Sequence, residues 1–161
     1  MRQLVCILLA FLVWLLLTWP ASWIDLGVGL FFAILVATLL SELYPEQPHA
    51  VFSPRRWFWA AVYLPYFFWC CLKANLDVAY RVLHVDLPIQ PGIVHVPTTL
   101  TSDWSKTFLA ASITLTPGTL VVDIDGQDLY IHWINVASTD REVQSRQIAA
   151  RFEPMLRRIF E

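Results

Sequence analysis

Two long apolar runs, Leu4–Trp19 and Ile24–Leu43, open the chain and are separated by a short segment that contains Pro20. A helix that spans a bilayer needs about 20 apolar residues, within a working range of roughly 17 to 25. The second run meets this length and the first falls just short of it. The pattern therefore predicts a transmembrane helical hairpin over residues 1–44.

The third apolar segment, Trp57–Leu72, is rich in Trp, Tyr and Phe and contains Pro65. Such aromatic residues favour the membrane interface over the hydrocarbon centre. With two spanning helices, the cations of this half of the chain all lie on the cytoplasmic side, as the positive-inside rule favours: Arg2, Arg55, Arg56, Lys73 and Arg81. We expect a cytoplasmic loop and an interfacial aromatic helix within residues 45–85, with a third membrane helix as the alternative.

Residues 86–161 have the composition of a small folded domain. Prolines bound a short strand, Gly92–Val96, and they are expected at a sheet edge or at the start of a strand. Ser102 and Asp103 suit the start of a helix, one as its cap and the other at the positive end of its dipole. The expected core stripe of this helix is Trp104, Phe108, Ala111 and Leu115.

The sequence Thr116-Pro117-Gly118-Thr119 predicts a type II turn after that helix, because glycine tolerates the positive φ of the third position. Alternating residues on both sides of Asp125-Gly126 then predict a hairpin. The register that places every apolar side chain on one face pairs Ile124 with Leu129, Val122 with Ile131 and Leu120 with Trp133.

The last segment predicts one more helix. Thr139 and Glu142 have the spacing of a capping box, and Pro154 is expected to kink the helix. Its expected core face is Ile148, Phe152, Leu156, Ile159 and Phe160. The order strand–helix–strand–strand–helix predicts an α+β domain with its helices on one face of the sheet (β-α-β-β-α).

No pattern for catalysis or ligand binding is present. The histidines, which are His49, His84, His95 and His132, have no second ligand at metal-binding spacing. Asp123, Asp125 and Asp128 fit a hairpin turn better than a calcium loop. The nucleotide-binding and nucleophile motifs are missing, and a net charge of -2 gives no attraction to nucleic acid. We expect no enzyme, catalytic residue, cofactor, metal site or nucleic-acid partner.

Charged residues in the two spans lie at their ends. Asp25 starts the second span and Glu42 finishes it. Ion pathways usually place ionisable groups deep in the bilayer, so the chain alone shows no ion pathway.

The stretches KANLDVAYRVL (Lys73–Leu83) and PGIVHVPTTLTSDWSKTFLAASITLTPGTLVVDIDGQDLYIHWINV (Pro91–Val136) resemble the E subunit of Mrp-type multisubunit cation/proton antiporters, also called MnhE, MrpE or PhaE. The resemblance covers essentially the whole chain. SITLTPGT, followed by a strand, an Asp-Gly turn and LYIHWI, is its most specific part, although Ala111 stands where the family usually has Asn. The motif residues, for which a structural role is expected, are Ser112, Thr114, Thr116, Pro117, Gly118, Thr119, Asp125, Gly126, His132 and Trp133.

The resemblance implies an accessory, assembly or scaffold subunit of a monovalent cation (Na⁺ or K⁺)/proton antiporter that serves pH homeostasis. It implies a multi-pass protein of the bacterial inner membrane with a cytoplasmic C-terminal domain. Its partners would be the bilayer and the other antiporter subunits, which carry the ions. Two other classes stay open: a membrane-tethered small-ligand-sensing or interaction domain, and an independent small transporter.

Overall fold

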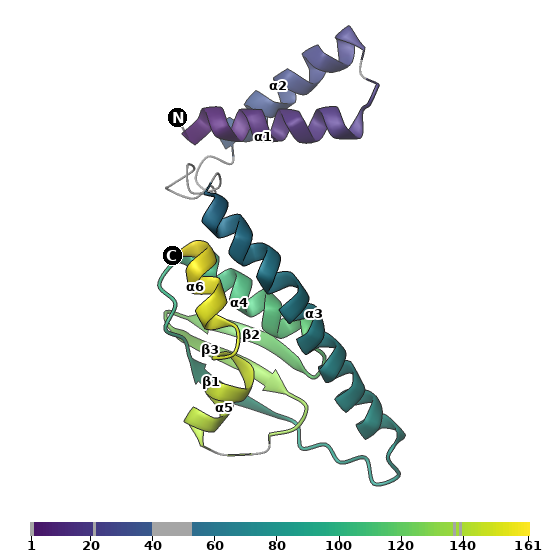
Figure 1. Cartoon of the computed structure of the whole chain (residues 1–161), viewed down its shortest axis with the longest axis vertical. Coiled ribbons are helices and arrows are strands. Elements are labelled where there is room, and N and C mark those ends of the chain that lie inside the picture. Colours follow the sequence, from purple (N-terminus) through teal and green to yellow (C-terminus); the bar gives the residue numbers. More distant parts are fainter. Residues whose placement is uncertain (1, 21, 40–52, 137, 139) are drawn as a thin grey trace. The chain divides into compact units, whose positions relative to one another are not determined.

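The computed structural model describes residues 2–20, 22–39, 53–136, 138 and 140–161. The chain forms two compact units, Met1–Ser53 and Pro54–Glu161 (Figure 1).

The first unit contains two helices, α1 (Arg2–Leu17) and α2 (Trp23–Leu39). Exposed leucine, isoleucine, valine and phenylalanine side chains cover much of both helices. Among the described residues, no helix combines the length and the apolar character that crossing a membrane requires. Residues 40–43 of the second predicted span lie outside the described part of the chain.

A tryptophan holds the two helices together. The Trp14 indole nitrogen donates to the carbonyl oxygen of Asp25 over 2.9 Å, and its ring stacks on Phe32. Gly29 faces the same ring, and a Cβ at that position would clash with it. The glycine therefore allows α2 to pack closely on Trp14.

The second unit begins with α3 (Pro54–Leu83), a single helix of 30 residues. Pro65 lies inside α3 and does not end the helix. One side of α3 packs on the core of the unit through Tyr63, Tyr66, Phe67 and Cys70.

Three antiparallel strands follow in the spatial order β1-β3-β2. They are β1 (Gly92–Pro97), β2 (Thr119–Asp125) and β3 (Asp128–Trp133). The predicted α+β class, and the place of β1 at the edge of the sheet, are confirmed.

Three further helices cover one face of this sheet: α4 (Asp103–Leu115), α5 (Arg141–Ile148) and α6 (Glu153–Phe160) (Figure 1). Side chains alternate between the two faces of a strand, and the buried ones on β1 and β3 are Val94, Val96, Leu129 and Ile131. The helices add Leu109, Ile113, Ile148 and Leu156 to the same core, and Phe152, directly before α6, lies in it as well.

The predicted core stripe of α4 is wrong. Its members Trp104, Phe108, Ala111 and Leu115 are exposed, and the buried residues are Ser105, Leu109, Ser112 and Ile113. Both stripes have helical spacing, and the first contains more apolar residues. Two serines can be buried because their hydroxyls donate to the carbonyl oxygens of Ser102 and Phe108. The predicted cap is confirmed, since Ser102 Oγ accepts from the Ser105 amide over 3.1 Å.

A β-bulge changes the predicted hairpin register. Ile124 pairs with Leu129 as expected, but Val121 pairs with Ile131 and Thr119 with Trp133, because the register shifts between Val121 and Asp123. An extra residue on one strand reverses which side chains face the core. Leu120 and Val122 are exposed as a result.

The predicted last helix is two helices, because the chain turns between α5 and α6. Pro154 lies in the first turn of α6, where its missing N–H costs no helical bond. Asp140 caps α5 by accepting from the Glu142 amide over 2.9 Å. Thr139 of the predicted capping box lies outside the described residues. The predicted core face is confirmed for Ile148, Phe152 and Leu156, which are buried, and for Ile159 and Phe160, which are partly buried.

Candidate functional site

The turn between α4 and β2 has the predicted geometry. Gly118 has a φ of 89°, and the Thr119 amide donates to the Thr116 carbonyl oxygen over 3.3 Å. The Thr119 hydroxyl lies 2.6 Å from the Ile113 carbonyl oxygen. The Thr116 hydroxyl donates to the Ser112 carbonyl oxygen over 2.8 Å. These threonines therefore satisfy carbonyl groups that the end of α4 leaves free. Pro117, at the second turn position, is half-buried.

Gly118 also lies against two other elements. A Cβ there would meet Ile134 Cγ2 at 2.9 Å and Val78 Cγ2 of α3 at 3.5 Å. The Gly118 carbonyl oxygen accepts from the Ile134 amide over 2.9 Å. The turn thus joins α4, the end of the hairpin and α3 at one place.

Ser112 makes a second link between α4 and α3. Its hydroxyl donates to the Phe108 carbonyl oxygen over 2.6 Å and lies 2.5 Å from the Tyr63 hydroxyl. Since Ser112 has one hydroxyl hydrogen and directs it to Phe108, Tyr63 is the donor of the second bond. Burial raises the pKa of Tyr63 to about 12, and the bond to Ser112 lowers it by less. Both groups are neutral at physiological pH.

The other motif residues are spread along the hairpin. Thr114 Oγ1 accepts from the Val121 amide over 3.2 Å at the start of β2. Asp125 and Gly126 form the opposite end of the hairpin, where Lys106 Nζ donates to the Gly126 carbonyl oxygen over 2.7 Å. His132 is exposed, and Trp133 is half-buried against the core. The motif residues therefore support the fold at several places and do not converge on one pocket.

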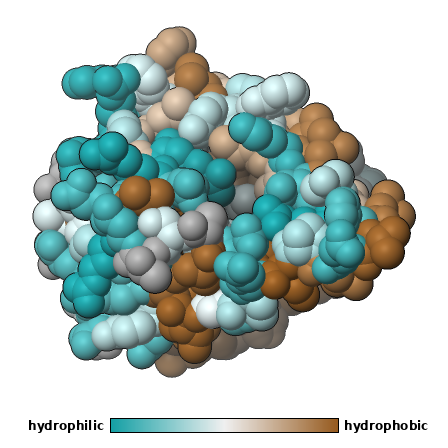
Figure 2. All heavy atoms as spheres, turned by 90° about the horizontal axis from the view of Figure 1, so that it is seen from below, coloured by the Kyte–Doolittle hydropathy of each residue, from teal (hydrophilic) through white to brown (hydrophobic). Residues whose placement is uncertain are grey.

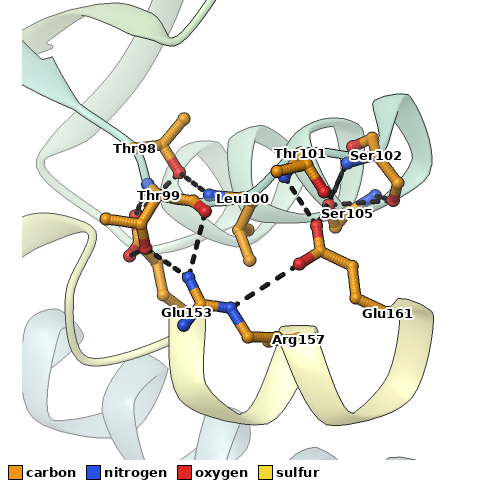
Figure 3. Close-up of polar contacts among 9 residues, drawn as sticks. All are labelled: Thr98, Thr99, Leu100, Thr101, Ser102, Ser105, Glu153, Arg157 and Glu161. Atoms are coloured by element: carbon orange, nitrogen blue, oxygen red, sulfur yellow. Dashed lines mark hydrogen bonds and ion pairs between the residues drawn. The ribbon is translucent and has the colours of Figure 1, made fainter.

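A polar cluster ties α6 to the loop between β1 and α4 (Figure 3). Glu153 is 8% exposed, and its two carboxylate oxygens accept from the hydroxyls of Thr98 and Thr99 over 2.7 and 2.6 Å. Arg157 Nη2 donates to the carbonyl oxygen of Thr99 over 3.0 Å. A buried carboxylate is tolerated here because strong donors surround it.

The same cluster extends to the start of α4. Glu161 accepts from the Thr101 and Ser102 amides over 2.6 and 3.0 Å and lies 2.9 Å from the Ser105 hydroxyl. Partial burial raises the pKa of Glu161, but these hydrogen bonds outweigh it, and the pKa lies below its usual value. A negative charge at this position also suits the positive end of the α4 dipole.

Sequence reasoning missed this cluster. Its one signal is the position of Glu153, directly after core residue Phe152 and three before core residue Leu156. An acidic residue on the buried side of a helix needs donors, and the Thr-rich segment after β1 supplies them.

The described residues contain no group of His, Cys, Asp or Glu side chains that could hold a metal ion. His95 Nε2 lies 2.9 Å from the Asp128 carboxylate, and the His95 ring stacks on Tyr130. His84 lies near Asp86 at the end of α3, and His49 lies outside the described residues. These contacts belong to separate places on the surface.

Comparison with known proteins gives a consistent result. A family model described as "Na+/H+ ion antiporter subunit" matches residues 7–159. The chain is 30% identical over 161 residues to the E1 subunit of the Na(+)/H(+) antiporter of Staphylococcus epidermidis, over 99% of this chain and 98% of that protein. It is 44% identical over 98 residues to the E subunit of the Na(+)/H(+) antiporter of Alkalihalophilus pseudofirmus, a match that spans 59% of this chain and 61% of that relative.

One solved structure is similar over nearly the whole chain. It is a chain in the structure of the membrane-bound sulfane sulfur reductase, an archaeal respiratory membrane complex. The TM-score is 0.83 and the identity 43%, over 99% of both chains.

Proposed function

The chain belongs to the family of Na⁺/H⁺ antiporter E subunits, and from this premise we propose that it is an accessory, assembly-promoting subunit of an Mrp-type multisubunit cation/proton antiporter. The family match over residues 7–159 carries this proposal. The partner subunits carry the ions, and Na⁺ or K⁺ is the cation exchanged for protons.

The position of Asp25 supports this division of roles. Its carboxylate accepts from the Ser22 amide over 2.8 Å and from the Ser22 hydroxyl over 2.7 Å, in the first turn of α2. A carboxylate that caps its own helix is held at the helix end. An ion pathway through this chain would need an ionisable group further inside.

We place the first unit in the bacterial inner membrane as a helical hairpin, α3 at the membrane interface, and the α+β domain in the cytoplasm. The exposed apolar side chains of α1 and α2 support the anchor. The exposed aromatic residues of α3 support the interface. In this arrangement residues 1–44 anchor the protein, 45–85 contact the interface, and 86–161 form the domain that meets other subunits.

A second candidate function follows from the structural similarity. The 43% identity to a chain of the sulfane sulfur reductase complex favours an accessory role in a respiratory membrane complex. A ligand-sensing domain has less support, because the motif residues lie at separate places on the hairpin.

The test is purification of the tagged chain from its native membrane, followed by identification of the accompanying proteins. Antiporter subunits, together with cation-dependent proton flux in reconstituted vesicles, are expected. Redox subunits would favour the respiratory assignment. A chain that purifies alone, with no change in flux when it is deleted, would contradict both assignments.

A further inference from the structure

The apolar stripe of α4 is only partly covered within the unit. Trp104 and Phe108 are each 42% exposed, Leu115 is 66% exposed, and Ala111 lies between them. The ring of Phe108 lies near those of Phe160 and Trp104, with centroids 4.5 and 6.4 Å apart. Large exposed apolar patches usually mark a contact with another molecule or a membrane.

The outer side of α3 continues this surface. Its exposed apolar residues recur at helical spacing and include Trp57, Leu64, Phe68, Leu72, Leu76 and Leu83. The two helices adjoin through the Tyr63–Ser112 bond and through the Cys71 thiol, 3.8 Å from the Leu115 carbonyl oxygen. In Figure 2, hydrophobic side chains lie at the right and in the lower middle of the view, and hydrophilic ones cover most of the left. The exposed apolar residues of α3 and α4 thus lie on two adjoining helices.

Cations accompany the apolar surface. α3 carries Arg55, Arg56, Lys73 and Arg81 against the single acid Asp77, which pairs with Arg81 at 2.8 Å. On α6, the Arg158 guanidinium lies 4.2 Å from the centre of the Trp59 ring. Basic residues next to exposed Trp, Phe and Leu are the composition of helices that bind in the plane of an anionic lipid surface.

We propose that the outer side of α3 and the exposed stripe of α4 together rest on an anionic phospholipid surface, so that the folded domain itself lies against the membrane. This inference rests on the proposed interfacial placement of α3 and extends it to α4. The short connection to the proposed membrane anchor favours a lipid surface as the partner. Residues 40–53 alone separate α3 from the apolar helix α2.

The test uses the full-length chain in nanodiscs of phosphatidylcholine and phosphatidylglycerol. Cys6, Cys70 and Cys71 are replaced by Ala, and single spin labels are attached at Phe108→Cys or Leu115→Cys on α4. Ile93→Cys and Val122→Cys, exposed on the open face of the sheet, are the controls. Collision with oxygen reports lipid, and collision with a nickel chelate reports water.

The oxygen-to-nickel ratio is expected to be several-fold higher at positions 108 and 115 than at the controls. Equal ratios would overturn the inference, and screening from both reagents would overturn it in favour of a protein contact. A label at Phe68→Cys separates this failure from that of the proposed function. If the label at position 68 is exposed to lipid and the label at position 108 to water, the proposed placement of α3 still holds and only its extension to α4 is wrong. If both labels are exposed to water, the placement of α3 is wrong as well.

The anionic character has its own test. Removing phosphatidylglycerol, or raising the salt concentration, should lower the ratio at position 108, because salt screens exposed charges. An unchanged ratio would contradict the role of the arginines. If the labelled variants do not fold, tryptophan fluorescence can be used instead. Brominated lipid quenches this fluorescence in the native chain and in Trp104→Phe, and the difference between the two gives the lipid exposure of Trp104. Equal quenching in the two proteins would overturn the proposal.

Discussion

Two glycines with positive φ have different surroundings, and the difference defines their roles. Gly118 has a φ of 89° and lies against Ile134 and Val78, whereas Gly126 has a φ of 60° and nothing within 4 Å of a Cβ. Gly118 is therefore required both for its backbone and for its lack of a side chain. Gly126 is required for its backbone alone.

The variant Gly118→Val should destabilise the unit by about 1–3 kcal/mol through backbone strain, with a further clash against Ile134. Native-gel abundance of the assembled complex should fall, and cation-dependent proton flux should fall only in proportion. Gly126→Asn is the matched control, because Asn tolerates this backbone region. A collapse of flux per complex at normal abundance would show that the turn takes part in transport.

Tyr63 gives a prediction at alkaline pH. Its pKa in the folded chain is raised to about 12, so the folded state holds the phenol proton more tightly than the unfolded state does. The stabilisation by Tyr63 is complete below about pH 10, the usual tyrosine value, and is lost as pH rises toward 12. Tyr63→Phe should cost about 1 kcal/mol at neutral pH and should lose less stability between pH 10 and 12.

Unfolding in detergent at pH 10 and at pH 12 measures this difference in stability. Tyr130→Phe, which removes an exposed phenol, is the control. An identical alkaline loss in Tyr63→Phe and the native chain would refute the role of Tyr63.

At the scale of elements, the sequence predicts the strands and the hairpin turn, because turn residues and alternation are local signals. It does not predict which stripe of α4 is buried. Besides their bonds to nearby carbonyl oxygens, the buried Ser105 and Ser112 contact Glu161 and Tyr63, which are far away in the sequence. The bulge in β2 is likewise absent from the predicted register. The Glu153 cluster depends on two segments that only the fold brings together.

Replacing the buried carboxylate should loosen α6. Glu153→Gln places an amide NH₂ among the hydroxyl and amide donors of Thr98 and Thr99, so the variant should lose about 1–3 kcal/mol of stability. Glu142→Gln, whose side chain is 82% exposed, is the control and should change stability by less than about 0.5 kcal/mol. Thermal unfolding in detergent compares them. Equal effects of the two variants would exclude a special role for the Glu153 cluster.

For the whole molecule, charge placement decides which functions the chain can carry. The carboxylate of Asp25 is bound by Ser22 at the start of α2. Glu42, at the other end of the predicted span, lies outside the described residues. The position of Asp25 agrees with the proposal that partner subunits carry the ions.

Asp25→Asn and Glu42→Gln should leave antiport by the assembled complex largely intact. The reason is that both carboxylates are predicted at helix ends, where water can solvate them. Proton flux driven by a cation gradient in vesicles measures this, normalised to the amount of complex. Complete loss of flux from an assembled complex would show that this subunit forms part of the ion route.

Topology can be tested independently. The N-terminus, the Ser41–Arg56 loop and the C-terminal domain should all face the cytoplasm. In this topology the cations of the N-terminal half of the chain lie on the cytoplasmic side, as the positive-inside rule favours. Cysteines introduced into the loop and the domain should resist impermeant reagents in intact cells and react after permeabilisation. A domain that reacts from outside would favour three spanning helices.

The contact between α3 and α6 also orders events during synthesis. The rings of Tyr63 and Phe152, the residue that caps the start of α6, lie edge to face with centroids 6.3 Å apart, so this part of the core closes only after the start of α6 has left the ribosome. At ordinary translation rates, α3 emerges on the order of ten seconds before α6. During that interval nothing from α6 covers either side of α3. We therefore expect the nascent chain to reach the bilayer first, and the domain to close afterwards on a helix that is already in place.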